Sequence, residues 1–253
     1  MQIDHLVEAV RRATPMSTAE LATRSGISRP TLYRMLAGTS PRVDDLRDLA
    51  AAVGVDIDAA LTTLSDPLAA VAARSILGDP FILEWTDDAE GWRERLRRYT
   101  STEAGADAAV VDEAGRASAP HHRDGAVHLR GESWRVDRIV SAGRASGGDW
   151  ALSGWAALDA LGVDTTGPSI VWAPDARGFA QLLGDTFSIG RVDHFDLVVV
   201  PAHPSVFAGA VEIEDVRLVA PLQAHIDAVG LGGSVRDAAL DHFRDAGRAR
   251  GDA

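Results

Sequence analysis

The sequence predicts an α+β protein in which a bundle of five short helices precedes a mixed α/β domain. The first 64 residues alternate short amphipathic segments with capping residues, whereas later segments mix helical spacing with unbroken apolar runs such as Leu197–Val200. A chain of 253 residues is long enough for more than one domain. We therefore expect a first domain at residues 1–65, a connecting helical or α+β region at 66–131, and an α/β domain at 132–250.

Composition places the chain among globular proteins of the cytoplasm. Hydrophobic residues make up 46% and charged residues 25% of the sequence, and there is no cysteine. The absence of cysteine excludes disulfides and thiolate metal sites. Neither a long apolar run nor an apolar segment after the first residues is present, so we expect no membrane span and no signal peptide.

Five helices are expected in the first domain. The second begins at Ser17 or Thr18 and ends at Gly26, and the third is capped by Ser28 and runs to Ala37. The other three are expected at residues 2–13, 43–53 and 57–64.

The second and third of these helices have the pattern of a helix-turn-helix. Two helices cross closely only where the contact is small and the turn tolerates a positive φ, and Ala22 and Gly26 meet these needs. Buried faces are expected from Leu21, Ile27, Leu32 and Met35. The second helix of such a pair is built to enter the DNA major groove. Outward-facing groups that could contact bases or phosphates there are Ser28, Arg29, Thr31, Tyr33 and Arg34.

Charge is divided unevenly along the chain. The formal net charge is −12, of which residues 1–64 carry −1 and the remainder −11. A nearly neutral DNA-binding unit makes few phosphate contacts, which favours a homodimer on a double-stranded operator.

Residues 2–64 resemble the Cro/repressor-type helix-turn-helix family. The resemblance implies that Ser28, Arg29, Tyr33 and Arg34 face base edges or the DNA backbone. It also implies phosphate contacts from the following loop, at Thr39, Ser40 and Arg42.

Beyond residue 65 we expect alternating helices and strands. Helices are expected at 68–77, 88–100, 134–142, 175–183, 221–229 and 234–248, with another after a turn at 147–162 that Ser153 caps. Strands are expected at 80–86, 169–172, 187–191, 197–200 and 216–219. Residues 101–131 are expected to be weakly structured, with a short strand through 108–111.

The C-terminal half resembles the antitoxin domain of AbiEi-type toxin–antitoxin systems. Three segments carry the resemblance, and their matching positions are Trp150, Leu152, Ser153, Gly154 and Ala157, then Pro221, Gln223 and Asp227, then Gly232, Gly233 and Arg236. It implies an autorepressor whose operon includes a nucleotidyltransferase-like toxin, without any need for direct contact between the two proteins. The residues also have a structural interpretation, because Gln223 and Asp227 share one helix face and suit a local hydrogen bond.

No enzyme motif is present. Phosphate-binding glycine loops and nucleophile elbows are absent, and Asp193 and Asp196 have the wrong spacing for a metal pair on a strand. We therefore expect no catalytic residues, no metal and no cofactor. Two alternatives to the antitoxin hypothesis remain: a transcriptional repressor that senses a small ligand, and a phosphoryl- or nucleotidyl-transfer enzyme.

Overall fold

The computed structural model describes residues 12, 16–57, 61–100, 105–131 and 135–251. The chain divides into two compact units, Met1–Thr62 and Thr63–Ala253. The boundary lies close to the predicted end of the first domain. Residues 66–131 belong to the same compact unit as the C-terminal half, so they are part of one domain and not a separate connection. None of the described helices has the length and apolar character needed to cross a membrane.

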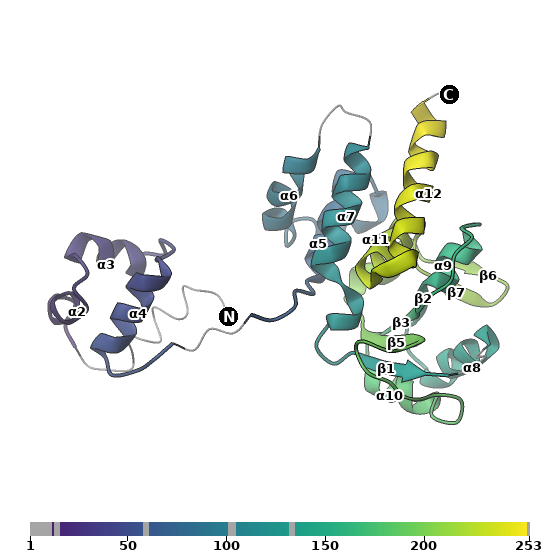
Figure 1. The fold of residues 1–253 in the computed structure, drawn as a ribbon, viewed down its shortest axis with the longest axis horizontal. Helices are drawn as coiled ribbons and strands as arrows, with labels where there is room; N and C mark the ends of the chain where they lie inside the picture. The colour runs from purple at the N-terminus through teal and green to yellow at the C-terminus, as the bar shows by residue number, and fades with distance from the viewer. Residues whose placement is uncertain (1–11, 13–15, 58–60, 101–104, 132–134, 252–253) are drawn as a thin grey trace. The chain divides into compact units, whose positions relative to one another are not determined.

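The described part of the first unit is helical wherever it forms regular structure. Its described helices are α2 (Thr18–Ser25), α3 (Arg29–Leu36) and α4 (Val43–Ala52) (Figure 1). Of the expected helix at 2–13, only Arg12 is among the described residues, and it is helical. The expected helix at 57–64 is wrong, because residues 61–64 are irregular. Leu61 is fully exposed and Leu64 is 48% exposed, so neither side chain has a core to stabilise a helix.

The second unit is built on a mixed seven-stranded sheet in the order β4-β1-β5-β3-β2-β7-β6. β3 (Ser169–Ala173) runs parallel to β5 (Leu197–Pro201) and antiparallel to β2 (Ala151–Gly154) at the centre. β1 (Val127–Arg130) pairs antiparallel with both β5 and β4 (Ser188–Ile189) on one side. On the other, β7 (Val216–Leu218) is parallel to β2 and antiparallel to β6 (Val211–Ile213).

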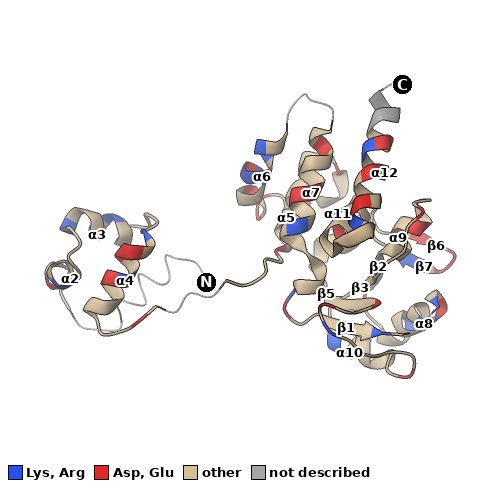
Figure 2. Ribbon diagram, in the orientation of Figure 1, with Lys and Arg blue, Asp and Glu red and all other residues tan. Residues whose placement is uncertain are grey.

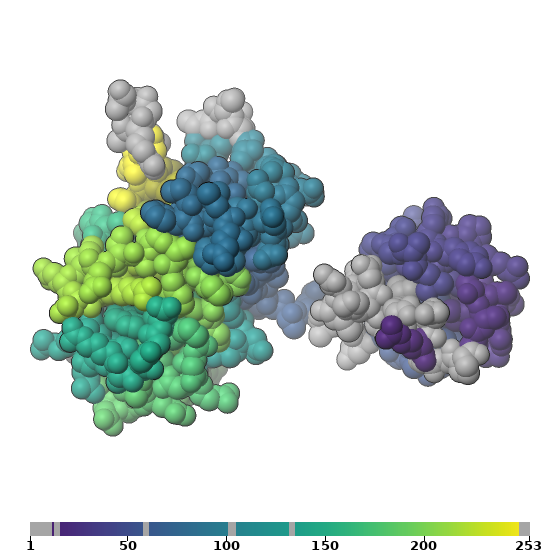
Figure 3. Space-filling view, turned by 180° about the vertical axis from the view of Figure 1, so that it is seen from behind, coloured from purple at the N-terminus to yellow at the C-terminus, as the bar shows by residue number. Residues whose placement is uncertain are grey.

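Helices cover both faces of this sheet. Figure 1 shows α8 (Val136–Ser146) and α10 (Ala176–Leu182) on one side. On the other side lie α5 (Pro67–Ile76), α7 (Ala106–Ser118), α11 (Pro221–Leu231) and α12 (Gly233–Gly251). One hydrophobic cluster joins the sheet to α8 and α10, and a second joins α5, α7, α11 and α12. In Figure 3 the blue segment that includes α5 lies against the green and yellow C-terminal half.

Several expected elements in this unit need correction. Residues 80–86 form the 3-10 helix η1 (Pro80–Trp85) and not a strand, because Asp79 accepts a hydrogen bond from the Phe81 N–H at 2.9 Å and Pro80 begins the turn. The expected strand at 108–111 is also wrong, since these residues lie within the 13-residue helix α7. Ser153 does not cap a helix: it lies on β2, and Gly154 precedes α9 (Trp155–Ala160).

The remaining helices begin and end close to the predicted positions. α6 (Glu90–Leu96) continues into η2 (Arg97–Tyr99) within the predicted 88–100 segment. α8 begins two residues later than expected and extends to Ser146. Short 3-10 turns follow α7 as η3 (Pro120–His122) and β5 as η4 (Pro204–Phe207).

Candidate nucleic-acid interface

The turn between α2 and α3 has the geometry that the sequence predicts. Gly26 caps α2 with φ 70°, in the left-handed region that glycine adopts without strain. Ser17 begins α2 by accepting a hydrogen bond from the Glu20 N–H at 3.2 Å. The short turn therefore fixes the direction in which α3 leaves α2.

A compact core holds the two helices against each other. It consists of Leu21, Ala22, Ile27, Leu32, Met35, Leu46, Leu49 and Ala50, all of which are at most 7% exposed. The burial of Leu21, Ile27, Leu32 and Met35 is as predicted, Ala22 is the predicted small residue, and α4 supplies the other three. Because Leu32 and Met35 are buried, the opposite face of α3 is left to solvent.

The exposed face of α3 carries the predicted contact residues. Arg29, Tyr33 and Arg34 are exposed, with Tyr33 at 60%. Within the described part of the chain, neither Arg29 nor Arg34 forms an ion pair, so both guanidinium groups keep their charge available for an anion. Figure 2 shows blue segments, which mark Lys or Arg, on α3 and red segments, which mark Asp or Glu, on α4.

Ser28 and Thr31 form hydrogen bonds that stabilise the start of α3. Ser28 Oγ accepts a hydrogen bond from the Thr31 N–H at 3.3 Å and lies 2.8 Å from Thr31 Oγ1. Arg34 Nη2 donates to the same Thr31 oxygen at 3.4 Å. Thr31 is only partly exposed. Its hydroxyl therefore serves to orient the Arg34 side chain and the first turn of α3, and it is poorly placed to contact a base.

The loop after α3 places the other predicted residues on the surface. Gly38 has φ 95°, and Thr39, Ser40 and Arg42 are exposed. Arg42 occupies the N-cap position of α4 without a side-chain cap hydrogen bond. All of the predicted contact residues therefore lie at the N-cap of α3, on α3 itself or in the loop that follows it.

The second unit contains a buried polar network around Asp227. This carboxylate is 1% exposed and accepts hydrogen bonds from Ser153 Oγ at 2.6 Å, Trp172 Nε1 at 2.8 Å and Gln223 Nε2 at 2.8 Å. Burial raises the pKa of Asp227, and the three donors oppose that shift. The predicted local hydrogen bond between Gln223 and Asp227 is confirmed.

Arg74 extends this network to the neighbouring helix. It is fully buried and donates to Asp79 Oδ2 at 2.7 Å, to Gln223 Oε1 at 3.3 Å, and to the carbonyls of Ser205 and Ala208 at 2.9 and 2.7 Å. These partners join α5 to η4 and α11. Sequence analysis did not identify Arg74, because its partners lie up to 149 positions away.

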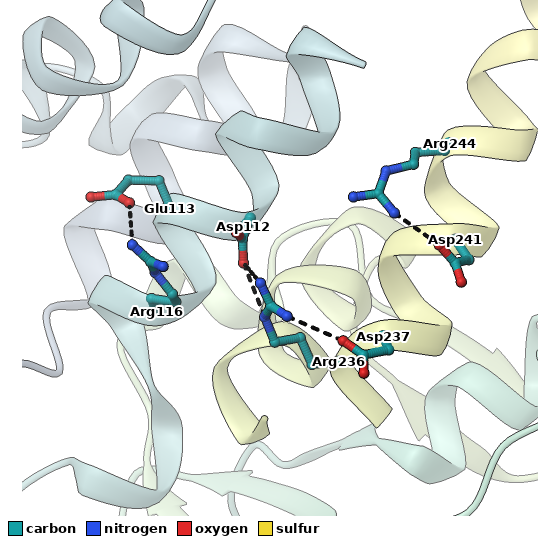
Figure 4. Close-up of polar contacts among 7 residues, drawn as sticks. All are labelled: Asp112, Glu113, Arg116, Arg236, Asp237, Asp241 and Arg244. Atoms are coloured by element: carbon teal, nitrogen blue, oxygen red, sulfur yellow. Dashed lines mark hydrogen bonds and ion pairs between the residues drawn. The ribbon is translucent and has the colours of Figure 1, made fainter. Parts of the chain in front are cut away.

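Other residues of the antitoxin resemblance also have structural partners. Gly154 has φ 71°, and a Cβ there would lie 2.9 Å from the Pro168 carbonyl oxygen. Arg236 on α12 donates to Asp112 on α7 at 2.8 Å and to Asp237 at 3.1 Å, which raises its pKa (Figure 4). These contacts fix the packing of β2 and α12.

The rings of His121 and His128 lie 5.7 and 5.1 Å from the ring of Phe195. The rings of His121 and His122 lie 3.9 Å apart, and burial lowers the pKa of His121 to about 4. His121 is partly buried, whereas His122 is exposed. No group of three or more potential metal ligands occurs among the residues that the structure describes.

Comparison with known proteins identifies the first unit. Residues 5–63 match a family model described as a helix-turn-helix domain. No curated protein and no solved structure matches the chain significantly. The resemblance of the C-terminal half to AbiEi-type antitoxins is not confirmed by these comparisons. The N-terminal unit is therefore a helix-turn-helix domain, which indicates a DNA-binding regulator.

Proposed function

We propose that the protein is a transcriptional repressor that reads a double-stranded operator with helix α3. The observation that carries this proposal is the exposed face of α3, where Arg29, Tyr33 and Arg34 project from a helix whose other face is fixed by a buried core. Arginine can donate two hydrogen bonds to guanine in the major groove, and its charge favours phosphate. We assign base contacts to Arg34 and Arg29, and a backbone or base contact to Tyr33.

The residues around α3 have supporting roles in this proposal. Ser28 and Thr31 preserve the N-terminal turn of α3, whose free N–H groups favour a phosphate oxygen. Thr39, Ser40 and Arg42 lie on the following loop and contact the backbone of the next nucleotides. The proposed division is the usual one, in which phosphate contacts fix the register and base contacts give the specificity.

We further propose that the protein is the antitoxin of an operon that encodes a nucleotidyltransferase-like toxin. The support is the sequence resemblance at residues 150–157, 221–227 and 232–236. Repression of the shared operon requires DNA binding only, so the proposal needs no contact with the toxin and no catalytic residue or cofactor. Co-expression with the neighbouring reading frame tests it: the protein must relieve the growth arrest that the neighbour alone produces.

A ligand-sensing repressor is the second candidate, and one observation favours it. The Nε and Nη1 donors of Arg123 are buried in the second unit and have no hydrogen-bond partner among the residues that the structure describes. A metabolic gene next to the regulator, without any toxic reading frame, would support this function over the antitoxin function.

The recognition assignment is tested by replacing Arg34 with alanine. We expect operator affinity to fall by about 1–3 kcal/mol, with relaxed preference at one base pair, because a bidentate base contact is lost. Fluorescence anisotropy on a set of operator variants measures both effects. Thermal melting should not change, since Arg34 is exposed.

Arg244→Ala is the matched control. Arg244 is also partly exposed, and it pairs with Asp241 at 2.8 Å on α12. The Arg244→Ala variant should bind the operator with the same affinity as the parent protein. If Arg34→Ala and the parent protein have equal operator affinity and equal base preference, the assignment of α3 as the helix that contacts the operator bases is wrong.

A further inference from the structure

Helix α6 and the following turn η2 carry a group of arginines in the second unit. Residues 90–99 contain four arginines and two glutamates, a net charge of +2, whereas the chain after residue 64 carries −11 in total. Figure 2 shows blue segments on α6. A local excess of positive charge on an otherwise acidic unit indicates a surface for a negatively charged partner.

The inner face of this segment is held in place by the core. Leu96 is fully buried in the hydrophobic cluster of α5, α7, α11 and α12, and Trp92 packs against the same cluster. The Trp92 indole Nε1 donates to Asp66 Oδ2 at 2.7 Å. Because this face is fixed, Arg95 and Arg98 are left exposed to solvent on another face.

The other two arginines of the segment already have a counter-charge. Glu90 Oε2 pairs with Arg93 Nη1 at 2.6 Å, and Glu90 Oε1 pairs with Arg97 Nη1 at 3.1 Å. Both oxygens of this glutamate are therefore engaged, and they do not neutralise Arg95 or Arg98.

Arg95 and Arg98 form no ion pair within the described part of the chain. The guanidinium carbon of Arg95 lies 4.8 Å from the centre of the Trp92 ring, and this contact steadies the side chain without using its N–H donors. Residues three positions apart are neighbours on a helical surface, so the two arginines lie side by side. Even with the exposed Glu94 beside them, this face keeps an excess of positive charge.

The DNA backbone is the partner that fits this face. The first 64 residues carry a net charge of −1, so the helix-turn-helix domain has few cations for phosphate contacts. A duplex held by α3 would present phosphates to the rest of the same chain at a high effective concentration. Guanidinium groups without a counter-charge bind phosphate oxygens through charge-assisted hydrogen bonds.

We propose that Arg95 and Arg98 contact phosphates of the DNA that flanks the base pairs read by α3. Such contacts add affinity without sequence preference. The proposal rests on operator binding by α3 and extends that binding to the second unit. Residues 53–66 connect α4 to α5, and a chain of that length spans at most about 50 Å, so the flanking phosphates lie within about 15 base pairs of the α3 site.

The test is the salt dependence of operator binding by the full chain. The double variant Arg95→Gln, Arg98→Gln is compared with the parent protein by fluorescence anisotropy, on a duplex with about 15 flanking base pairs on each side. Loss of two phosphate contacts should reduce the slope of log K against log salt concentration by about 2, and should weaken binding about tenfold at about 0.15 M salt. Base preference should not change, because no base edge is contacted.

The double variant Arg177→Gln, Arg191→Gln is the matched control. It removes the same charge from the second unit, at Arg177 on the exposed surface of α10 and at Arg191, whose side chain is 81% exposed. It should keep the salt slope of the parent protein. Equal slopes in the parent and the Arg95, Arg98 variant, or equal losses in both double variants, would overturn the proposal and favour an acidic protein as the partner of this face.

Shortening the flanking DNA gives a second measurement that needs no change in the second unit. The parent protein should lose about tenfold in affinity when the flanks are removed, whereas residues 1–65, which contain the first compact unit and its core, should bind both duplexes equally. No loss in the parent protein would overturn the proposal. Arg34→Ala reports on α3 separately: if it alters base preference while the Arg95, Arg98 variant binds with the affinity and slope of the parent, only the flanking contact fails.

Discussion

Asp227 shows how a buried charge shapes the second unit at the scale of a single residue. Its three donors come from β2, β3 and its own helix, so one carboxylate connects two central strands to α11. The sequence predicted only the partner four positions away, because helical spacing defines that neighbour. Ser153 and Trp172 are 74 and 55 positions away, and only the folded sheet brings them to the same oxygen.

Replacing Asp227 with alanine should destabilise the protein strongly. The change leaves the Ser153 hydroxyl, the Trp172 indole N–H and the Gln223 amide without an acceptor in a buried place, with an expected cost of about 3–5 kcal/mol in the free energy of unfolding. Urea denaturation measures the loss. Asp159→Ala on the exposed surface of α9 should change the midpoint little. A loss below about 1 kcal/mol would show that the network contributes little to stability.

At the scale of elements, the sequence predicted those segments whose signals are local. Gly26 and Ser28 define the turn and the start of α3, and the apolar run at 197–200 identifies a central strand. The prediction is wrong for α7, because residues 101–131 are rich in glycine, alanine, serine and aspartate, a composition that predicts weak structure. Small residues there serve close packing, and the helix against which they pack begins more than a hundred positions later.

Gly115 marks the closest approach of α7 to α11. A Cβ at Gly115 would lie 2.6 Å from Val229 Cβ and 2.8 Å from the Ile226 carbonyl oxygen. Gly115→Ala should therefore destabilise the second unit by about 1–3 kcal/mol, although alanine favours helix. Gly91→Ala in α6 is the matched control, because nothing lies within 4 Å of its Cβ position, and it should stabilise by about 0.5 kcal/mol. Shifts of the urea midpoint in the same direction for both variants would contradict this packing.

The contact face of α3 and the surroundings of Arg123 differ in how far the sequence could predict them. The contact face of α3 follows from local spacing, since Leu32 and Met35 fix which side is buried and thereby expose Arg29 and Arg34. The surroundings of Arg123 come from α5, η4 and α11, which lie far from it in the sequence. Whether an arginine is paired is a property of the tertiary structure, so no sequence pattern indicated that its Nε and Nη1 are buried without a partner among the described residues.

At the scale of the whole molecule, the charge distribution favours a dimer on DNA. The first 64 residues carry a net charge of −1 and the rest of the chain carries −11. One helix-turn-helix domain of this charge makes few phosphate contacts and should bind weakly at physiological salt. Two copies related by a two-fold axis would place two α3 helices in successive major grooves, about 34 Å apart.

This assembly predicts a weaker complex for the isolated N-terminal domain than for the full chain. Residues 1–65 include the whole first compact unit with its own buried core, so they can be tested alone. Footprinting with the full chain should protect two half-sites about one helical turn apart, related as an inverted repeat. The fragment should bind the same DNA at least about tenfold more weakly, because it lacks any dimer contacts from the second unit. One protected half-site and equal affinity for both proteins would instead mean that the second unit takes no part in operator binding.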